Sequence, residues 1–378
     1  MEEKIVRTTS LFMVMLAVFI CTSLCYLPAL EVKAQQYVAK QMRIRQERQE
    51  REEMWAMLSG LEFLDYSTRQ AMATATEEGL SGNQQKTAAE ALDFPQQLRL
   101  ELPKNTTRDD VTINNHYVTQ TIDISIRGAT DDYLVRYPMI GKSDHIADLN
   151  YYADQDGGTL ELSMEHVYEL SLDWEEQYLY IDFIAPRDIY DKIVVIDAGH
   201  GANMPGAIMG DVQEKDIDLA IVKQLKKLFD ETADEKLGVY YTRLDDSDPA
   251  FADRSGLAND IGANLFVSVH SNSYPKSETI NGTAVLFDEK KEAKGNSSKH
   301  LAHILLKKTT EALGSKNMGL VAGNDIYIIR TSEVPAALVE VGFMTNPKEL
   351  ANLTDKKYQK KCARAIYEGI MQALEEGY

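Results

Sequence analysis

Three short apolar runs in the second half of the chain each lead into a residue that can bind or assist a metal. The runs and their polar residues are 193–196 with His200, 265–269 with His270, and 337–339 with Glu340. Short runs rich in β-branched residues are typical of strands buried on both faces, which form parallel sheets covered by helices. Because ligands of open α/β sheets bind at the carboxyl ends of the strands, the pattern predicts a site at one sheet edge.

The same half of the chain, residues 191–378, alternates strand patterns with helical ones. The expected strands are 193–196, 238–243, 265–270, 283–287, 325–329 and 336–341, and the expected helices are 216–232, 253–261, 297–313 and 355–376. Such alternation predicts a mostly parallel α/β sheet flanked by helices.

Residues 111–187 change to a period of two. Segments 122–126 and 160–164 alternate strictly between apolar and polar residues, and 178–184 adds a further strand. This pattern predicts a small β-rich domain with one face of its sheet buried. The sequence of this domain does not indicate its role.

The first 34 residues contain an apolar stretch, 11–30, that has no charged residue. About 20 residues of helix cross the hydrocarbon core of a bilayer, so this stretch predicts a transmembrane segment or a long signal peptide. Residues 32–34 resemble a cleavage site, so a membrane-anchored and a secreted product both remain open.

Residues 35–110 are expected to form a helical stalk and a linker. Segment 35–57 is rich in Gln, Glu, Arg and Met and lacks Gly and Pro, which favours a helix. Gly and Pro then mark linkers up to residue 110. The stalk and the β-rich domain are the candidate regions for a protein partner.

Charge and cysteine content narrow the functional classes. The net charge is -19 and no basic stripe is present, which argues against a nucleic-acid partner. Of the three cysteines, Cys21 and Cys25 lie in the apolar stretch and Cys362 stands alone, so no structural disulfide is expected after residue 34.

The candidate chemistry is that of a catalytic zinc. Glu214 stands just before the helix expected to begin near residue 216, and with His200 and His270 it offers two imidazoles and one carboxylate. Catalytic zinc sites use three such ligands and leave a fourth position to water. Glu340 is the candidate base that takes the water's proton and passes it to the leaving nitrogen.

Four short motifs occur in a characteristic order. They are DAGHG at 197–201, EKD at 214–216, SVHSN at 268–272 and VEVGFMTN at 339–346. Together they resemble the zinc-dependent N-acetylmuramoyl-L-alanine amidase family, whose catalytic domain would cover about residues 192–374. The resemblance implies hydrolysis of the amide between N-acetylmuramic acid and L-alanine in peptidoglycan, with one zinc on His200, Glu214 and His270 and with Glu340 as the catalytic glutamate.

Other positions match or depart from the family's motifs. Arg254 and Asn259 match an arginine and asparagine motif before the second histidine, and we expect both to be structural or close to substrate. Ser271 stands where an alanine is usual. The departures remove no ligand and leave substrate preference open.

The leading hypothesis is an amidase that acts on peptidoglycan outside the cytoplasm, either anchored by residues 11–30 or secreted. Two alternatives remain at this point. One is an exported zinc peptidase or deacylase that acts on another amide, and the other is an inactive wall-binding protein.

Overall fold

The computed structural model describes residues 96–378 except 138, 142–143, 233 and 290–296. The expected membrane segment, the expected helix at 35–57 and most of the expected linker lie outside these residues. Within the described part, no helix is both long and apolar enough to cross a membrane.

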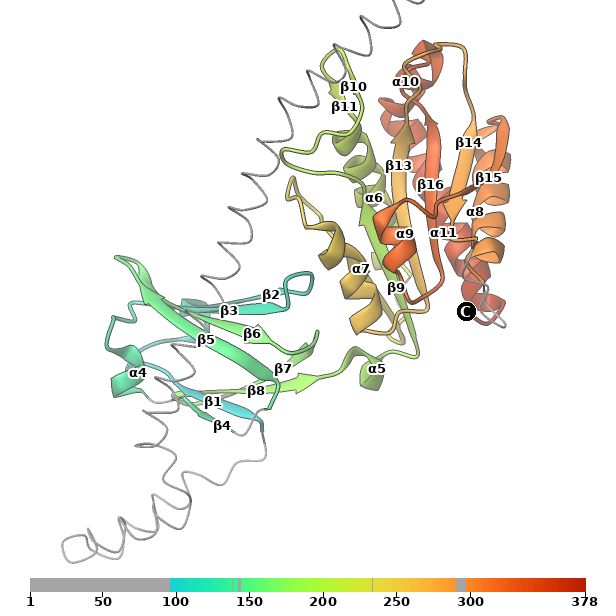
Figure 1. Cartoon of the computed structure of the whole chain (residues 1–378). Helices are drawn as coiled ribbons and strands as arrows, with labels where there is room; N and C mark the ends of the chain where they lie inside the picture. The colour runs from blue at the N-terminus through green and yellow to red at the C-terminus, as the bar shows by residue number, and fades with distance from the viewer. Residues whose placement is uncertain (1–95, 138, 142–143, 233, 290–296) are drawn as a thin grey trace, which may run out of the picture. The chain divides into compact units, whose positions relative to one another are not determined.

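The N-terminal part of the described chain is a β-sandwich (Figure 1). One antiparallel sheet has the order β4-β1-β8-β7, and the other has the order β2-β3-β6-β5. Buried side chains of both sheets, among them Leu100, Ile124, Leu162 and Ile181, form one core. The elements are β1 (Leu98–Glu101), η1 (Arg108–Asp110), β2 (Val111–His116), β3 (Thr121–Arg127), α4 (Tyr133–Arg136), β4 (Ile140–Gly141), β5 (Ile146–Ala153), β6 (Gly157–Met164), β7 (Glu169–Glu175) and β8 (Tyr178–Ile184).

The sandwich includes the segment expected to be rich in β-strands, but it begins earlier than residue 111. Strand β1 precedes that boundary, pairs with β8 along its whole length, and buries Leu98 and Leu100. The expected linker therefore ends before residue 98. The four residues of β1, LRLE, do alternate between apolar and polar, so this strand could have been predicted from the sequence.

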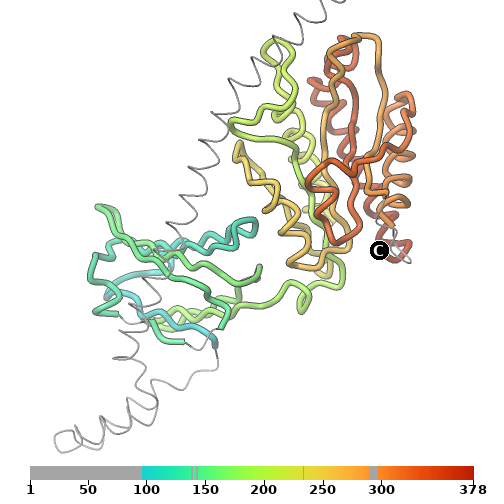
Figure 2. The backbone as a smooth tube through the Cα atoms, in the orientation of Figure 1, coloured from blue at the N-terminus to red at the C-terminus, as the bar shows by residue number. Residues whose placement is uncertain are grey.

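Residues 186–378 form the α/β domain, and Figure 2 traces the chain through it from green to red. Its elements are α5 (Pro186–Ile189), β9 (Lys192–Ala198), β10 (Ile208–Met209), β11 (Val212–Gln213), α6 (Glu214–Asp230), β12 (Leu237–Tyr241), α7 (Phe251–Asp260), β13 (Leu265–Asn272), β14 (Thr283–Phe287), α8 (Ser298–Leu313), β15 (Asn317–Ala322), α9 (Tyr327–Thr331), β16 (Ala336–Phe343), α10 (Pro347–Leu353) and α11 (Lys356–Glu375).

The main sheet is mostly parallel, as expected, but one of its pairings is antiparallel, so the sheet is mixed. Its order is β12-β9-β13-β16-β14-β15, and the first four strands are parallel to one another. Strand β14 runs antiparallel to β16, and β15 is parallel to β14. The connection from β13 to β14 contains no helix. A direct return of this kind reverses the chain, whereas a parallel neighbour requires a crossover.

The expected strand at 325–329 is wrong. Most of that segment belongs to helix α9, and the sixth strand of the sheet is β15, at Asn317–Ala322. A short apolar run cannot be assigned to strand or helix from periodicity alone. Gly319, at φ +90°, interrupts the true strand and weakens its pattern.

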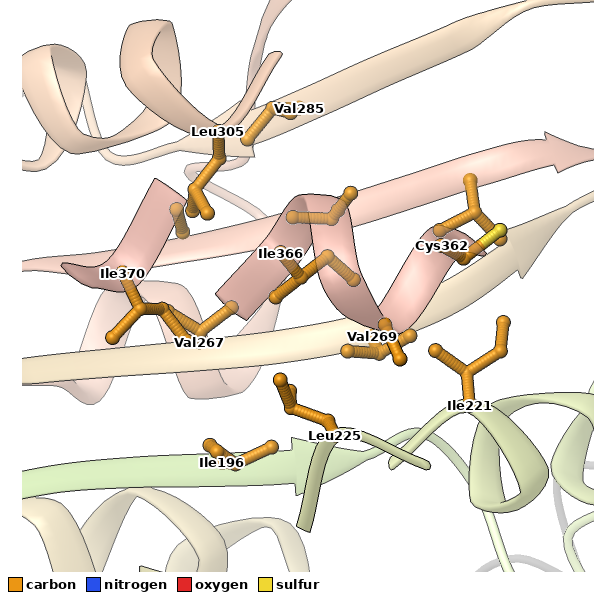
Figure 3. Packing of buried hydrophobic residues seen from close by; sticks show 14 of the residues in the cluster. Ile196, Ile221, Leu225, Val267, Val269, Val285, Leu305, Cys362, Ile366 and Ile370 are labelled. Carbon is orange, nitrogen blue, oxygen red and sulfur yellow. The ribbon is translucent and has the colours of Figure 1, made fainter. Parts of the chain in front are cut away.

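Two cores cover the two faces of the sheet. Alternate residues of β9 divide between them: Val194 and Ile196 face α6, α8 and α11, and Ile193 and Val195 face α7 and α9. Figure 3 shows Ile366 and Ile370 of α11 packed over Val267 of β13. Burial on both faces explains the continuously apolar runs of the sequence.

Two carboxylates join the sandwich to the α/β domain. Glu169 accepts hydrogen bonds from the hydroxyls of Tyr117 and Tyr240, and Asp260 accepts one from the backbone N–H of Val167. The sandwich is therefore bound through polar side chains of α7 and β12 as well as through apolar contacts.

Candidate metal centre

The four residues expected at the site come together at one edge of the sheet. His200 follows β9, Glu214 is the first residue of α6, and His270 lies in β13. Glu340 lies in the neighbouring strand β16, opposite His270 in the register. Glu214 is thus on a helix and not in the loop before it, because the helix begins two residues earlier than its apolar pattern suggests.

The two imidazoles converge on one carboxylate oxygen. The Oε1 atom of Glu214 lies 3.1 Å from Nε2 of His200 and 3.0 Å from Nδ1 of His270. The two rings are 4.9 Å apart between centroids and nearly perpendicular, at 76°. Two ring nitrogens and a carboxylate oxygen that face one small volume form a donor set that fits a divalent cation.

The other oxygen of Glu214 is held by the backbone. The N–H of Ala207 donates to Oε2 at 2.8 Å, which fixes the orientation of the carboxylate. Burial alone would raise the pKa of Glu214, but the hydrogen bonds and charge of His200 and His270 hold that pKa well below its usual range. The carboxylate is therefore ionised and ready to bind a cation at neutral pH.

A strained turn carries His200. Its φ is +60°, in the left-handed region that non-glycine residues rarely adopt. Gly199 precedes it, and a Cβ atom there would lie 2.4 Å from the ring of His270. The glycine is thus required by the close approach of the His270 ring to the backbone at residue 199.

Buried arginines hold this turn in place. Arg254 donates to the carboxylate of Asp197 at 2.9 Å and to the carbonyl oxygen of His200 at 2.7 Å. Arg243 donates to the carbonyl oxygens of Ala198 and Gly199. Arg254 is thus almost fully buried and supports the backbone of this turn.

Asn259 is also structural. Its side-chain amide donates to the carbonyl oxygen of Thr331 and accepts from the N–H of Glu333. These bonds tie α7 to the last residue of α9 and to the segment that follows it. Asn259 binds neither the histidines nor Glu214 in the hydrogen bonds found here.

Glu340 is enclosed and free of hydrogen bonds at one oxygen. Among the described residues, Oε2 of Glu340 has no partner. Burial, and after it the negative charge of Glu214, raises the pKa of Glu340 to about 8. A carboxyl group with a pKa near neutrality can both accept and release a proton.

Asp218 is a site residue that the sequence reasoning missed. It is fully buried, and one of its oxygens lies within 4.8 Å of ligand atoms from His200, Glu214 and His270. Burial, and then the charge of Glu214, raises its pKa well above the usual range. The helical spacing of four from Glu214 could have revealed it, since residues i and i+4 share a helix face.

Comparisons with known proteins identify the family of the α/β domain. Residues 194–372 match the family model described as N-acetylmuramoyl-L-alanine amidase. The chain is 35% identical over 186 residues to the uncharacterized protein YqiI of Bacillus subtilis, which covers 49% of this chain and 86% of that protein. It is 30% identical over 199 residues to the germination-specific N-acetylmuramoyl-L-alanine amidase of the same organism, which covers 49% of this chain and 81% of that one.

One solved structure is similar over the same share of the chain. The catalytic domain of CwlV, an N-acetylmuramoyl-L-alanine amidase from Bacillus (Paenibacillus) polymyxa var. colistinus, is 35% identical. The match covers 49% of this chain and 98% of that one, with a TM-score of 0.45.

The close approach at Gly199 generates a testable expectation. Gly199→Ala should displace the ring of His270 and lower zinc affinity by about 10–100-fold, the range typical of disturbing groups that orient a metal ligand. Gly256→Ala is the matched control, because it lies within α7 and its Cβ would meet nothing within 4 Å. Competition with a chromogenic chelator measures both affinities, and equal values for the two variants would contradict the steric argument.

The raised pKa of Glu340 predicts how stability depends on pH in the metal-free protein. Folding raises this pKa from 4.5 to about 8, so the folded state holds the proton more tightly than the unfolded state. The free energy of unfolding should therefore fall as pH rises from about 4.5 to about 8. In urea unfolding with chelator present, the free energy of unfolding of Glu340→Gln should fall less steeply with pH than that of wild type. An identical dependence on pH in variant and wild type would refute the raised pKa of Glu340.

Proposed function

The chain belongs to the N-acetylmuramoyl-L-alanine amidase family, so its α/β domain is a peptidoglycan hydrolase, and we propose that it works with one zinc ion held by His200, Glu214 and His270. The bond cleaved joins the lactyl group of N-acetylmuramic acid to L-alanine. The observation that carries this proposal is the convergence of both imidazoles on Oε1 of Glu214.

The donor set supports zinc over harder cations. Calcium and magnesium prefer shells of oxygen atoms, whereas two ring nitrogens and one carboxylate suit zinc in its catalytic form. When bound, zinc supplies Lewis-acid chemistry, because it polarises carbonyl groups and makes water more acidic. The protein's own part is to hold the three ligands and to place a base beside them.

We assign that base to Glu340. Its Oε2 atom has no hydrogen-bond partner among the described residues, so no described protein group competes for the proton that this oxygen would accept. Glu340 takes a proton from the attacking water and then gives it to the nitrogen of the departing L-alanine. Its pKa of about 8 in the metal-free site favours such a two-way transfer.

The place of action follows from the substrate. Peptidoglycan lies outside the cytoplasm, so we propose that the α/β domain acts there. The apolar stretch at 11–30 would anchor the chain in the membrane, or would be removed if the chain is secreted. The stalk and the sandwich remain the candidate regions for a protein partner.

The test is digestion of purified peptidoglycan by the whole chain, followed by mass analysis. Wild type should bind about one equivalent of zinc and release stem peptides that begin with a free L-alanine amino group. Glu340→Gln should keep the zinc and lose about 10²–10⁴-fold in rate, because it cannot transfer the proton. Glu333→Gln, which makes the same change at an exposed position, is the control.

Two outcomes would overturn parts of this proposal. Full activity of Glu340→Gln would show that another group transfers the proton. Products cut within the stem peptide would indicate a peptidase instead. Chelator should abolish the activity of wild type, and added zinc should restore it.

A further inference from the structure

The regular pairing of strand β13 with its two neighbours ends close to His270. Its pairing with β9 ends at Val269. Its pairing with β16 is regular up to His270 and then shifts before Asn272. Ser271 lies in this irregularity, so the sheet alone does not determine where this part of the strand sits.

Ser271 is instead bound at two points to helix α6. Its hydroxyl donates to Oδ1 of Asp218 at 2.9 Å, and its backbone N–H points to Oε1 of Glu214 at 3.3 Å. Glu214 and Asp218 stand one turn apart on the helix. The side-chain bond is the shorter of the two, and it connects two fully buried residues.

The bond bears directly on the metal ligands. Glu214 comes from α6 and His270 from β13, and the next residue of β13 is Ser271. A link between Ser271 and α6 therefore controls how far Nδ1 of His270 lies from Oε1 of Glu214, which is 3.0 Å. Catalytic metal sites depend on supporting hydrogen bonds of this kind to hold their ligands in place.

We propose that Asp218 is a positioning residue for the zinc site, which acts through the Ser271 hydroxyl to hold His270 at its working distance from Glu214. The inference rests on the proposed function, because it presumes a cation at these ligands. The proposal leaves Asp218 outside the ligand set, although one of its oxygens lies within 4.8 Å of ligand atoms from His200, Glu214 and His270. Its other oxygen, Oδ2, is buried and has no hydrogen-bond partner among the described residues.

The proposal predicts a pattern across four variants of the whole chain. Asp218→Ala and Ser271→Ala should each lower zinc affinity by about 10–100-fold, since each removes the same bond. The double variant should bind zinc no less tightly than the single variant that has the lower zinc affinity. Asp218→Asn keeps an oxygen that can accept from Ser271, so it should recover most of the affinity.

The control is Asp216→Ala, an exposed aspartate two residues earlier on the same helix, which should leave zinc affinity unchanged. Affinity is measured by competition with a chromogenic chelator. The visible absorption of the cobalt-loaded protein gives a second readout, because Asp218→Ala should change its intensity and Asp218→Asn should not. A merely structural role for Asp218 would alter stability and leave this spectrum as it is.

The outcomes separate this proposal from the one on which it rests. If wild type binds no zinc, the proposed function fails. If wild type binds zinc and Asp218→Ala binds it as tightly, only the positioning role is refuted. The positioning role is also refuted if the losses of zinc affinity in the two single variants add in full in the double variant. Should Asp218→Ala fail to fold, Ser271→Ala decides the question alone.

Discussion

The metal centre depends on the buried ion pair between Asp197 and Arg254, whose side chains are each 1% exposed. Buried charges are tolerated only when they are paired and hydrogen-bonded, and here Thr242 and Ser268 donate to the same carboxylate. With both charges satisfied, Arg254 can also donate to the carbonyl oxygen of His200. That bond holds the histidine in its strained backbone conformation, which brings its ring to Glu214.

Near this ion pair, three elements of the α/β domain each position one of the proposed metal ligands. The end of β9 carries His200, the first turn of α6 carries Glu214, and β13 carries His270. Their polar atoms are largely bound to one another or to the backbone. Glu340 differs, because Oε2 has no partner among the described residues and its pKa is raised to about 8. A buried group left unpaired costs stability, and the retention of Glu340 agrees with a role in proton transfer. Oδ2 of Asp218 is a second unpaired atom at the site among the described residues.

Much of the site could be predicted from the sequence, because burial on both faces makes a strand continuously apolar and leaves its polar end conspicuous. The resemblance to the amidase family, drawn from the same segments, is confirmed by the match over 194–372. Asp218 escaped because a lone carboxylate on an amphipathic helix resembles a solvated one until tertiary packing buries it. The reversed strand β14 escaped because strand direction depends on how a loop returns, which local periodicity does not record.

The central claim is that three side chains hold the metal and a fourth, close by, stays off it. An X-ray crystal structure of the zinc-loaded protein, with anomalous data at the zinc edge, tests this most directly. The account predicts one zinc bound by a nitrogen of His200, a nitrogen of His270 and an oxygen of Glu214, with both oxygens of Glu340 outside the coordination shell. A zinc ligated by Glu340, or one bound away from these three residues, would contradict it.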